Sequence, residues 1–176
     1  MKAVFLDRDG TLIVDPPDLR VDSVEKIKLF PDTVEALKLL ATLDFEVFIV
    51  SNQAGIAEGL ISREQFEIIN GRVLELLAPS EVKIVQTYIC PHSQEDKCVC
   101  RKPQPTMLQW AAEDFEIDLT QSWMIGDRET DVLAGSAAGT KTILVQTGNT
   151  MGHSDDATFT AATLLDAINF IKSQVE

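Results

Sequence analysis

The sequence has few positive charges and few histidines. Its 176 residues include 15 lysines and arginines against 28 aspartates and glutamates, a formal net charge of −13 at pH 7. The basic stripe that nucleic-acid binding requires is missing, so we expect no nucleic-acid partner. The two histidines are His92 and His153. Because His153 lies in a glycine- and serine-containing stretch, it is a poor candidate base for a Ser-His-Asp triad, and a phosphohistidine mechanism is equally disfavoured.

Long hydrophobic runs are also missing. No apolar segment approaches the roughly 20 residues of a membrane span. The first residues lead directly into a strand-like run at positions 3–6, which is not typical of a signal peptide. We therefore expect a soluble, cytoplasmic monomer with no membrane partner. With 45% hydrophobic and 24% charged residues, the composition predicts a single globular domain over residues 1–176.

Cysteine is rare and clustered. Cys90, Cys98 and Cys100 lie within eleven residues, with His92 among them. An odd count in such a chain argues against a disulfide framework. Three thiolates and one imidazole are a standard structural zinc set that leaves no open position for water, so we expect a bound Zn²⁺. The alternatives are a redox pair of Cys98 and Cys100, although C-x-C disulfides are strained, or solvated thiols.

Short apolar runs alternate with amphipathic stretches along the chain. Asp32 and Thr33 can cap the first helix, and Ser62 with Gln65 forms a capping-box pattern for the second. Alternating strands and helices predict parallel βαβ units, which build an open three-layer α/β sheet with helices on both faces. Strands are expected over residues 3–6, 47–50, 84–89, 123–125 and 142–145, and helices over residues 33–41, 62–77, 105–115, 129–138 and 161–171.

Polar segments follow the expected strands. In sheets of this kind, ligands bind beyond the carboxyl ends of the strands. Four segments should therefore meet at one edge: Asp7-Arg8-Asp9-Gly10-Thr11, Ser51-Asn52-Gln53-Ala54-Gly55, Arg101-Lys102-Pro103 and Gly126-Asp127-Arg128-Glu129-Thr130-Asp131.

The carboxylates in these segments indicate a magnesium-dependent phosphate site. Clustered carboxylates repel one another unless a cation intervenes, and oxygen ligands without nearby thiolates favour Mg²⁺. A lysine and small hydroxyl residues beside Mg²⁺ are typical of phosphate binding. Taken separately, Asp7 and Asp9 could form a strand-end turn and Asp127 could cap a helix. The coincidence of all four segments favours the functional interpretation.

In order and spacing, these segments resemble the four motifs of the haloacid dehalogenase superfamily of phosphatases. Cys-Pro-His followed by Cys-x-Cys-Arg-Lys-Pro resembles one subgroup, which contains the histidinol-phosphate phosphatase domain and the heptose 1,7-bisphosphate phosphatases. The resemblance covers nearly the whole chain and implies a Rossmann-like fold. Neither gap where the superfamily inserts a cap domain can hold one here, so we expect a capless enzyme.

The resemblance implies a role for each motif residue. Asp7 would be the nucleophile that forms an aspartyl-phosphate, and Asp9 would be the general acid that later activates water. Ser51 would bind a phosphoryl oxygen, and Lys102 would neutralise the phosphoryl charge and hold Asp7 in place.

The resemblance also implies the metal ligands and the substrate contacts. Mg²⁺ would be bound by the carboxylates of Asp7 and Asp127 and the backbone carbonyl of Asp9, with Asp131 in support. Thr11, Asn52 and Arg101 would contact the substrate, a small phosphorylated metabolite.

The two branches of the subgroup differ in substrate. The segment 15–22 and the five-residue spacer between His92 and Cys98 resemble the histidinol-phosphate branch, whereas residues 51–57 resemble the heptose branch. We predict histidinol phosphate as the substrate, with D-glycero-D-manno-heptose 1,7-bisphosphate as the alternative. Two other classes stay open: a binding module that has lost turnover, which the intact motif residues argue against, and phosphotransfer to another acceptor, which normally needs a cap to exclude water.

Overall fold

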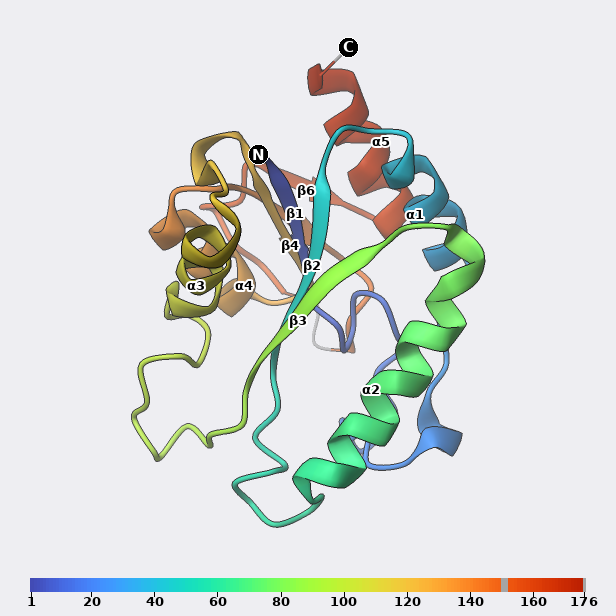
Figure 1. Ribbon diagram of the computed structural model, residues 1–176, viewed down its shortest axis with the longest axis vertical. Coiled ribbons are helices and arrows are strands. Elements are labelled where there is room, and N and C mark those ends of the chain that lie inside the picture. Colours follow the sequence, from blue (N-terminus) through green and yellow to red (C-terminus); the bar gives the residue numbers. More distant parts are fainter. Residues whose placement is uncertain (150–151, 176) are drawn as a thin grey trace.

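A six-stranded parallel sheet forms the centre of the computed structural model, which describes residues 1–149 and 152–175. The strand order is β3-β2-β1-β4-β5-β6, so the direction of winding reverses between β1 and β4 (Figure 1). This is the doubly wound order, in which the crevice at the reversal is the usual ligand site. The strands are β1 (Ala3–Leu6), β2 (Glu46–Asn52), β3 (Ile84–Cys90), β4 (Trp123–Gly126), β5 (Lys141–Val145) and β6 (Phe159–Ala161).

Helices cover both faces of the sheet and make the three layers expected from the sequence. Helices α1, α2 and α5 pack on one face, and α3 and α4 on the other (Figure 1). The helices are α1 (Thr33–Ala41), α2 (Arg63–Leu77), α3 (Thr106–Phe115), α4 (Glu129–Ala138) and α5 (Leu164–Val175), with 3-10 turns at Val24–Lys26, Ala78–Ser80 and Leu119–Gln121.

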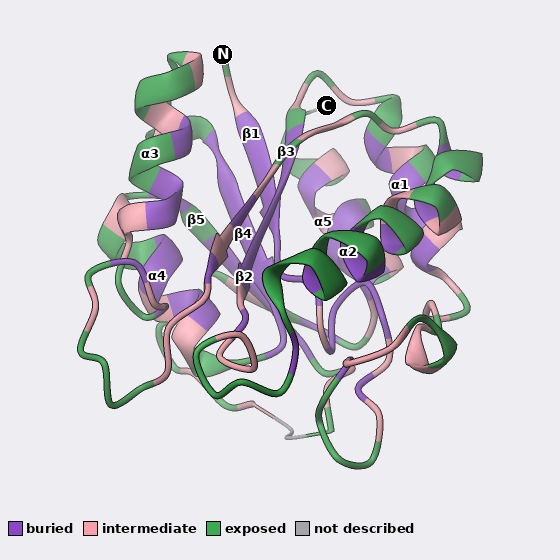
Figure 2. Cartoon of the chain, turned by 60° about the horizontal axis from the view of Figure 1, so that its bottom comes forward, coloured by how far each residue is buried: buried purple, intermediate pink, exposed green. Residues whose placement is uncertain are grey.

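Strand β1 shows why the sheet must be covered on both faces. Val4 and Leu6 point into the core under α1 and α5, whereas Ala3 and Phe5 point into the core under α3. All four side chains are fully buried, and the central strands are buried along their length (Figure 2). A strand buried on both faces has no polar side, which explains the continuous apolar runs in the sequence. The sheet therefore presents its chemistry only at the strand ends.

Two local signals in the sequence are confirmed. Ser62 Oγ accepts a hydrogen bond from Gln65 N (3.1 Å), and Gln65 Oε1 accepts one from Ser62 N (2.7 Å), which is the capping box at the start of α2. Gly139 ends α4 with φ at +92°, a left-handed conformation that glycine adopts without strain.

Two expectations were wrong in detail. The last helix begins at Leu164, because Ala161 belongs to β6, a three-residue edge strand too short for a clear alternation pattern. Asp32 lies at the first position before α1 but makes no side-chain cap there. Its carboxylate instead accepts a hydrogen bond from Leu165 N (2.9 Å), so it caps α5, which packs beside α1.

The segments where a cap could be inserted are short. Between β1 and α1 the only helical piece is Val24–Lys26, and between β2 and α2 the chain forms turns alone. The edge of the sheet is therefore covered only by loops. None of the helices in the described part of the chain is long and apolar enough to cross a membrane.

Candidate active site

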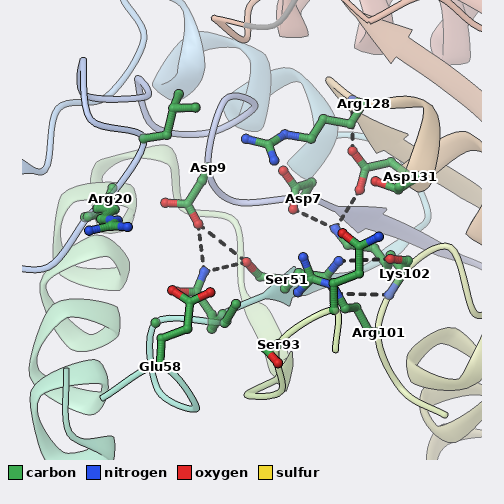
Figure 3. Close-up of a pocket in the computed structure, with 18 of the residues that line it drawn as sticks. Asp7, Asp9, Arg20, Ser51, Glu58, Ser93, Arg101, Lys102, Arg128 and Asp131 are labelled. Carbon is green, nitrogen blue, oxygen red and sulfur yellow. Dashed lines mark hydrogen bonds and ion pairs between the residues drawn. The ribbon is translucent and has the colours of Figure 1, made fainter. Parts of the chain in front are cut away.

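A cleft of about 1000 Å³ opens at the carboxyl ends of the central strands. It lies at the reversal of the strand order, where β1 and β4 are neighbours. The motif residues Asp7, Asp9, Ser51, Lys102 and Asp131 line it together, as the topology predicted (Figure 3).

Lys102 is the most deeply enclosed cation of the cleft, with only 3% of its surface exposed. Its Nζ donates hydrogen bonds to Asp7 Oδ1 (2.7 Å) and to the carbonyl oxygen of Val50 (2.8 Å). The same Nζ lies 2.6 Å from Asp131 Oδ1. Burial opposes the charged ammonium, but the two carboxylates outweigh it and raise the pKa of Lys102 above its ordinary value. Lys102 therefore stays charged beside Asp7.

Asp131 has both carboxylate oxygens engaged. Oδ1 pairs with Lys102, and Oδ2 accepts a hydrogen bond from Arg128 N (3.0 Å) at the start of α4. The backbone at Gly126 approaches so closely that any Cβ there would overlap the Asp131 side chain. Asp131 thus links the helix terminus to Lys102, and its supporting role at a metal ion stays a prediction.

Asp127 is the best placed of the buried carboxylates to hold a cation. Its Oδ2 is buried and has no hydrogen-bond partner among the residues that the structure describes, and its Oδ1 accepts a bond from Thr11 Oγ1 (3.4 Å). Carboxylate oxygens of Asp7, Asp127 and Asp131 all lie within 4.8 Å of one another. Three negative charges this close, one with an orphaned oxygen, fit a divalent cation with oxygen ligands.

The pKa values of these carboxyls reflect the same crowding. Burial, followed by the charge of Asp131, raises the pKa of Asp127 to about 6, although Arg128 partly opposes this. Burial also raises the pKa of Asp7 well above its ordinary value, against the lowering effect of Lys102. A bound cation would offset both shifts, because it favours the ionised carboxylates.

Glycines let the backbone close around Asp127. At Gly10, whose φ is +84°, and at Gly148, a Cβ would overlap the Asp127 carboxylate. Thr147 Oγ1 donates to the carbonyl oxygen of Gly10 (2.6 Å), which ties these two segments together. The close packing fixes the carboxylate in one orientation.

Asp9 lies apart from this cluster, with its carboxylate directed at Ser51 and Gln53 (Figure 3). Arg8 binds both of its oxygens, with Nε 3.0 Å from Oδ2 and Nη2 3.1 Å from Oδ1. Gln53 Nε2 donates to Asp9 Oδ2 and to Ser51 Oγ, both at 2.8 Å. The candidate acid–base residue is therefore held by two side chains.

The three expected substrate contacts occupy different places. Arg101 lines the cleft and donates from Nη1 to the carbonyl oxygen of His92 (3.2 Å). Asn52 also lines the cleft, but its side-chain amide is bonded to the backbone of Lys102. Nδ2 donates to the carbonyl oxygen of Lys102 (3.1 Å), and Oδ1 accepts from its backbone N–H (3.0 Å). Thr11 is fully buried behind Asp127. Contact between these three residues and a substrate stays a prediction.

The cysteine cluster lies on the loop that leads to Lys102. Sulfur and nitrogen atoms of Cys90, His92, Cys98 and Cys100 approach one another at 3.1–3.7 Å, with His92 facing the thiols through Nδ1. A tetrahedral zinc site with bonds of about 2.3 Å to sulfur and 2.0–2.1 Å to nitrogen has ligand–ligand edges of about 3.5–3.8 Å. The four side chains fit that size.

Reasoning from the sequence missed three residues of the site. It assigned no function to Arg8 and Gln53, which both contact Asp9, or to Arg128, which contacts Asp127. Arg8 lies between two aspartates in a polar segment, so its charge alone gave no signal of its role. Gln53 and Arg128 carry no signal either, because their contacts arise only when the strand ends meet.

Comparisons with known proteins place the chain among phosphatases. The HAD-hydrolase-like family model matches residues 99–169. The chain is 40% identical over 154 residues to a D-glycero-beta-D-manno-heptose-1,7-bisphosphate 7-phosphatase of Pasteurella multocida, over 84% of this chain and 83% of that protein. It is 39% identical over 130 residues to the histidine biosynthesis bifunctional protein HisB of Legionella pneumophila, over 74% of this chain and 37% of that protein. The chain thus spans about two fifths of the length of such HisB relatives.

A solved structure shares almost the whole fold. The D,D-heptose 1,7-bisphosphate phosphatase from B. bronchiseptica, complexed with magnesium and phosphate, superposes with a TM-score of 0.91 at 29% identity. The match covers 99% of this chain and 100% of that one.

Proposed function

This chain belongs to the haloacid dehalogenase-like phosphatases, which are phosphoric monoester hydrolases, and from that premise we propose that it hydrolyses histidinol phosphate through an aspartyl-phosphate on Asp7. The arrangement of Asp7 against Lys102 and Asp131 is the observation that supports this mechanism. A carboxylate nucleophile divides one difficult displacement into two easier steps. We also propose that the chain acts as a single-domain monomer.

In the first step, the Asp7 carboxylate attacks phosphorus as the bond to the leaving alkoxide breaks. Asp9 gives its proton to that alkoxide. Lys102 and the hydroxyl of Ser51 stabilise negative charge on the phosphoryl oxygens, since Lys102 lies beside Asp7 and Ser51 beside Asp9 in the lining of the cleft.

In the second step, a water molecule attacks the phosphorus of the aspartyl-phosphate. Asp9 takes the proton from this water, so that it ends the cycle protonated and ready for the next substrate. The phosphate leaves and the Asp7 carboxylate is restored beside Lys102.

Asp7, Asp127 and the backbone carbonyl of Asp9 would hold Mg²⁺, with Asp131 in support. When bound, the ion supplies positive charge against the phosphoryl oxygens. Zn²⁺ on Cys90, His92, Cys98 and Cys100 would order the loop that carries Arg101 and Lys102.

The rim of the cleft carries carboxylates that suit a cationic leaving group. Asp18, Asp22 and Glu58 line it beyond the reacting residues, and Glu58 lies on the side of Asp9 (Figure 3). Histidinol phosphate carries an amine and an imidazole, which such carboxylates can bind. Asp18 and Asp22 are already paired with Lys26 at 2.6 and 2.9 Å, which leaves Glu58 and Glu129 among the rim carboxylates. Of these two we choose Glu58, because it lies on the side of Asp9, the proposed acid for the leaving group (Figure 3).

A second candidate is D-glycero-D-manno-heptose 1,7-bisphosphate. Arg20, Lys97 and Arg101 also line the cleft, and a second phosphate group requires cations of this kind. The match to a heptose phosphatase over most of both chains supports the same alternative.

Phosphate release from both esters, measured side by side with Mg²⁺, separates the two. We expect histidinol phosphate to be preferred at least about 100-fold in kcat/KM, equal to about 2.7 kcal/mol of differential transition-state binding. Glu58→Gln should lower this preference, with Arg20→Gln as the matched change in the cationic set. The opposite preference would identify the heptose branch. Absence of release from any phosphomonoester would indicate a binding module.

A further inference from the structure

Arg8 has a charged side chain that takes no part in the proposed reaction steps. It lies between the two reactive aspartates in the sequence, and only 1% of its surface is exposed. Burying a guanidinium is costly unless a counter-charge and hydrogen bonds compensate for the lost water. The position of Arg8 inside the protein therefore needs a partner that justifies it.

That partner is the carboxylate of Asp9. The two nitrogens Nε and Nη2 lie 3.0 and 3.1 Å from the two oxygens, which is the two-pronged geometry that only arginine offers. The remaining nitrogen, Nη1, is buried without a hydrogen-bond partner in the described part of the chain. The guanidinium carbon lies 5.5 Å from the ring centre of Phe66 on α2, so a cation–π contact also helps to hold the guanidinium fork, meaning Nε and Nη2, in place.

Gln53 completes the restraint from the next strand. Its Nε2 donates to Asp9 Oδ2 at 2.8 Å, and that oxygen also accepts from Arg8 Nε and lies 3.5 Å from Ser51 Oγ. Oδ1 accepts only from Arg8 Nη2 among these contacts. Oδ1 thus keeps a lone pair for the proton that must move in each half of the reaction.

We propose that Arg8, assisted by Gln53, is the positioning residue for acid–base catalysis by Asp9, with the transferred proton carried on Oδ1. This inference rests on the proposed phosphatase function. Proton transfer to a leaving oxygen depends steeply on placement, and a carboxyl free to rotate would spend most of its time out of line. The buried fork fixes both the position and the plane of the carboxyl group.

The dependence of rate on the leaving group tests this role. An alkyl phosphate needs a proton on its leaving oxygen, whereas 2,4-dinitrophenyl phosphate releases a phenolate that needs none. Because kcat/KM reports steps up to departure of the leaving group, it isolates the acid role of Asp9. Arg8→Met should lower kcat/KM for the alkyl ester about 100-fold and leave the dinitrophenyl ester within about threefold.

Three further variants make the result decisive. Gln53→Met should show the same selective loss of kcat/KM for the alkyl ester, to a smaller extent. Arg8→Lys keeps the charge but not the two-pronged contact, so its loss should lie between those of Arg8→Met and the wild-type protein. Arg72→Met is the matched control, since Arg72 is exposed and pairs with Glu75 on the surface of α2. If Arg8→Met does not fold, Arg8→Lys and Gln53→Met carry the same comparison.

Equal losses on both esters, or no loss on either, would overturn the assignment of Arg8. Failure of the proposed function itself would look different. In that case the wild-type protein would hydrolyse neither ester, or Asp7→Asn would retain its activity.

Discussion

Replacing Lys102 with methionine should destabilise the protein in a way that depends on pH. Methionine keeps a side chain of similar length in this buried position but removes the ammonium group. Lys102 Nζ lies 2.7 Å from Asp7 Oδ1 and 2.6 Å from Asp131 Oδ1, and both carboxylates are buried. The variant would therefore leave a cluster of buried carboxylates without its nearest cation.

The size of the effect follows from the burial. Removing one partner of a buried ion pair costs about 3–5 kcal/mol, because the remaining charge is uncompensated. For a urea dependence of about 2 kcal/mol per molar, the unfolding midpoint should fall by about 1.5–2.5 M at pH 7.5. At pH 5 the loss should be smaller, since protonated carboxyls no longer need the ammonium.

The sign of the pH dependence is fixed by the direction of the pKa shifts. Burial already raises the pKa of Asp7, and it raises the pKa of Asp127 to about 6. Without Lys102 the pKa of Asp7 must rise further. In the interval between the unfolded value, about 4, and the folded values, the folded variant binds more protons than the unfolded chain. Its stability must therefore fall as the pH rises through that interval.

Urea titrations followed by circular dichroism, with chelator present, measure this directly. Lys38→Met is the matched control, because Lys38 is exposed on α1 and does not line the cleft. This variant should change the free energy of unfolding by less than about 0.5 kcal/mol. A loss below about 1 kcal/mol at pH 7.5, or an equal loss at both pH values, would mean that Lys102 does not compensate the buried carboxylates.

Three other outcomes test the metal sites. Gly148→Ala should weaken Mg²⁺ binding at least about tenfold, since its Cβ would overlap the Asp127 carboxylate. Gly71→Ala, whose Cβ meets nothing within 4 Å, should leave the binding unchanged. Similar Mg²⁺ titration curves for both variants would mean that the close packing around Asp127 does not position a metal ligand. Burial raises the pKa of Asp127 to about 6 and also raises that of Asp7, so Mg²⁺ affinity measured by calorimetry should fall at least about tenfold for each pH unit below 6. A constant affinity from pH 5 to 7 would contradict the role of these carboxylates as ligands. Cys98→Ser should lower the zinc content from about one per chain and reduce the melting temperature; a wild-type protein that never holds zinc would require another explanation for the cluster.

The sequence predicted the fold because its signals are local. Apolar runs such as those in β1 and β2, the Ser62 capping box and Gly139 each act within a few residues. Parallel topology then brings the strand ends together, so the approach of Asp7, Lys102 and Asp131 followed without knowledge of any contact. β6 was missed because three residues do not establish a period.

Contacts across the fold could not be predicted in the same way. Asp32 stands before one helix in sequence yet caps another helix in space. Asn52 carries a polar group suited to a ligand, but it bonds the backbone of Lys102. Arg8 lies in a polar segment where an arginine is unremarkable, and its two-pronged contact with Asp9 depends on a side-chain conformation that no sequence pattern encodes.

The central claim is that Asp7 carries the phosphoryl group during turnover. The most direct test is to mix the protein and Mg²⁺ with a phosphomonoester labelled in its phosphoryl group, quench with acid and map the label by peptide mass spectrometry. We expect a labelled peptide that contains Asp7 and loses its label with hydroxylamine, as an acyl phosphate does, and no label in Asp7→Asn. Turnover without labelled protein, label on another residue, or turnover by Asp7→Asn would contradict this claim.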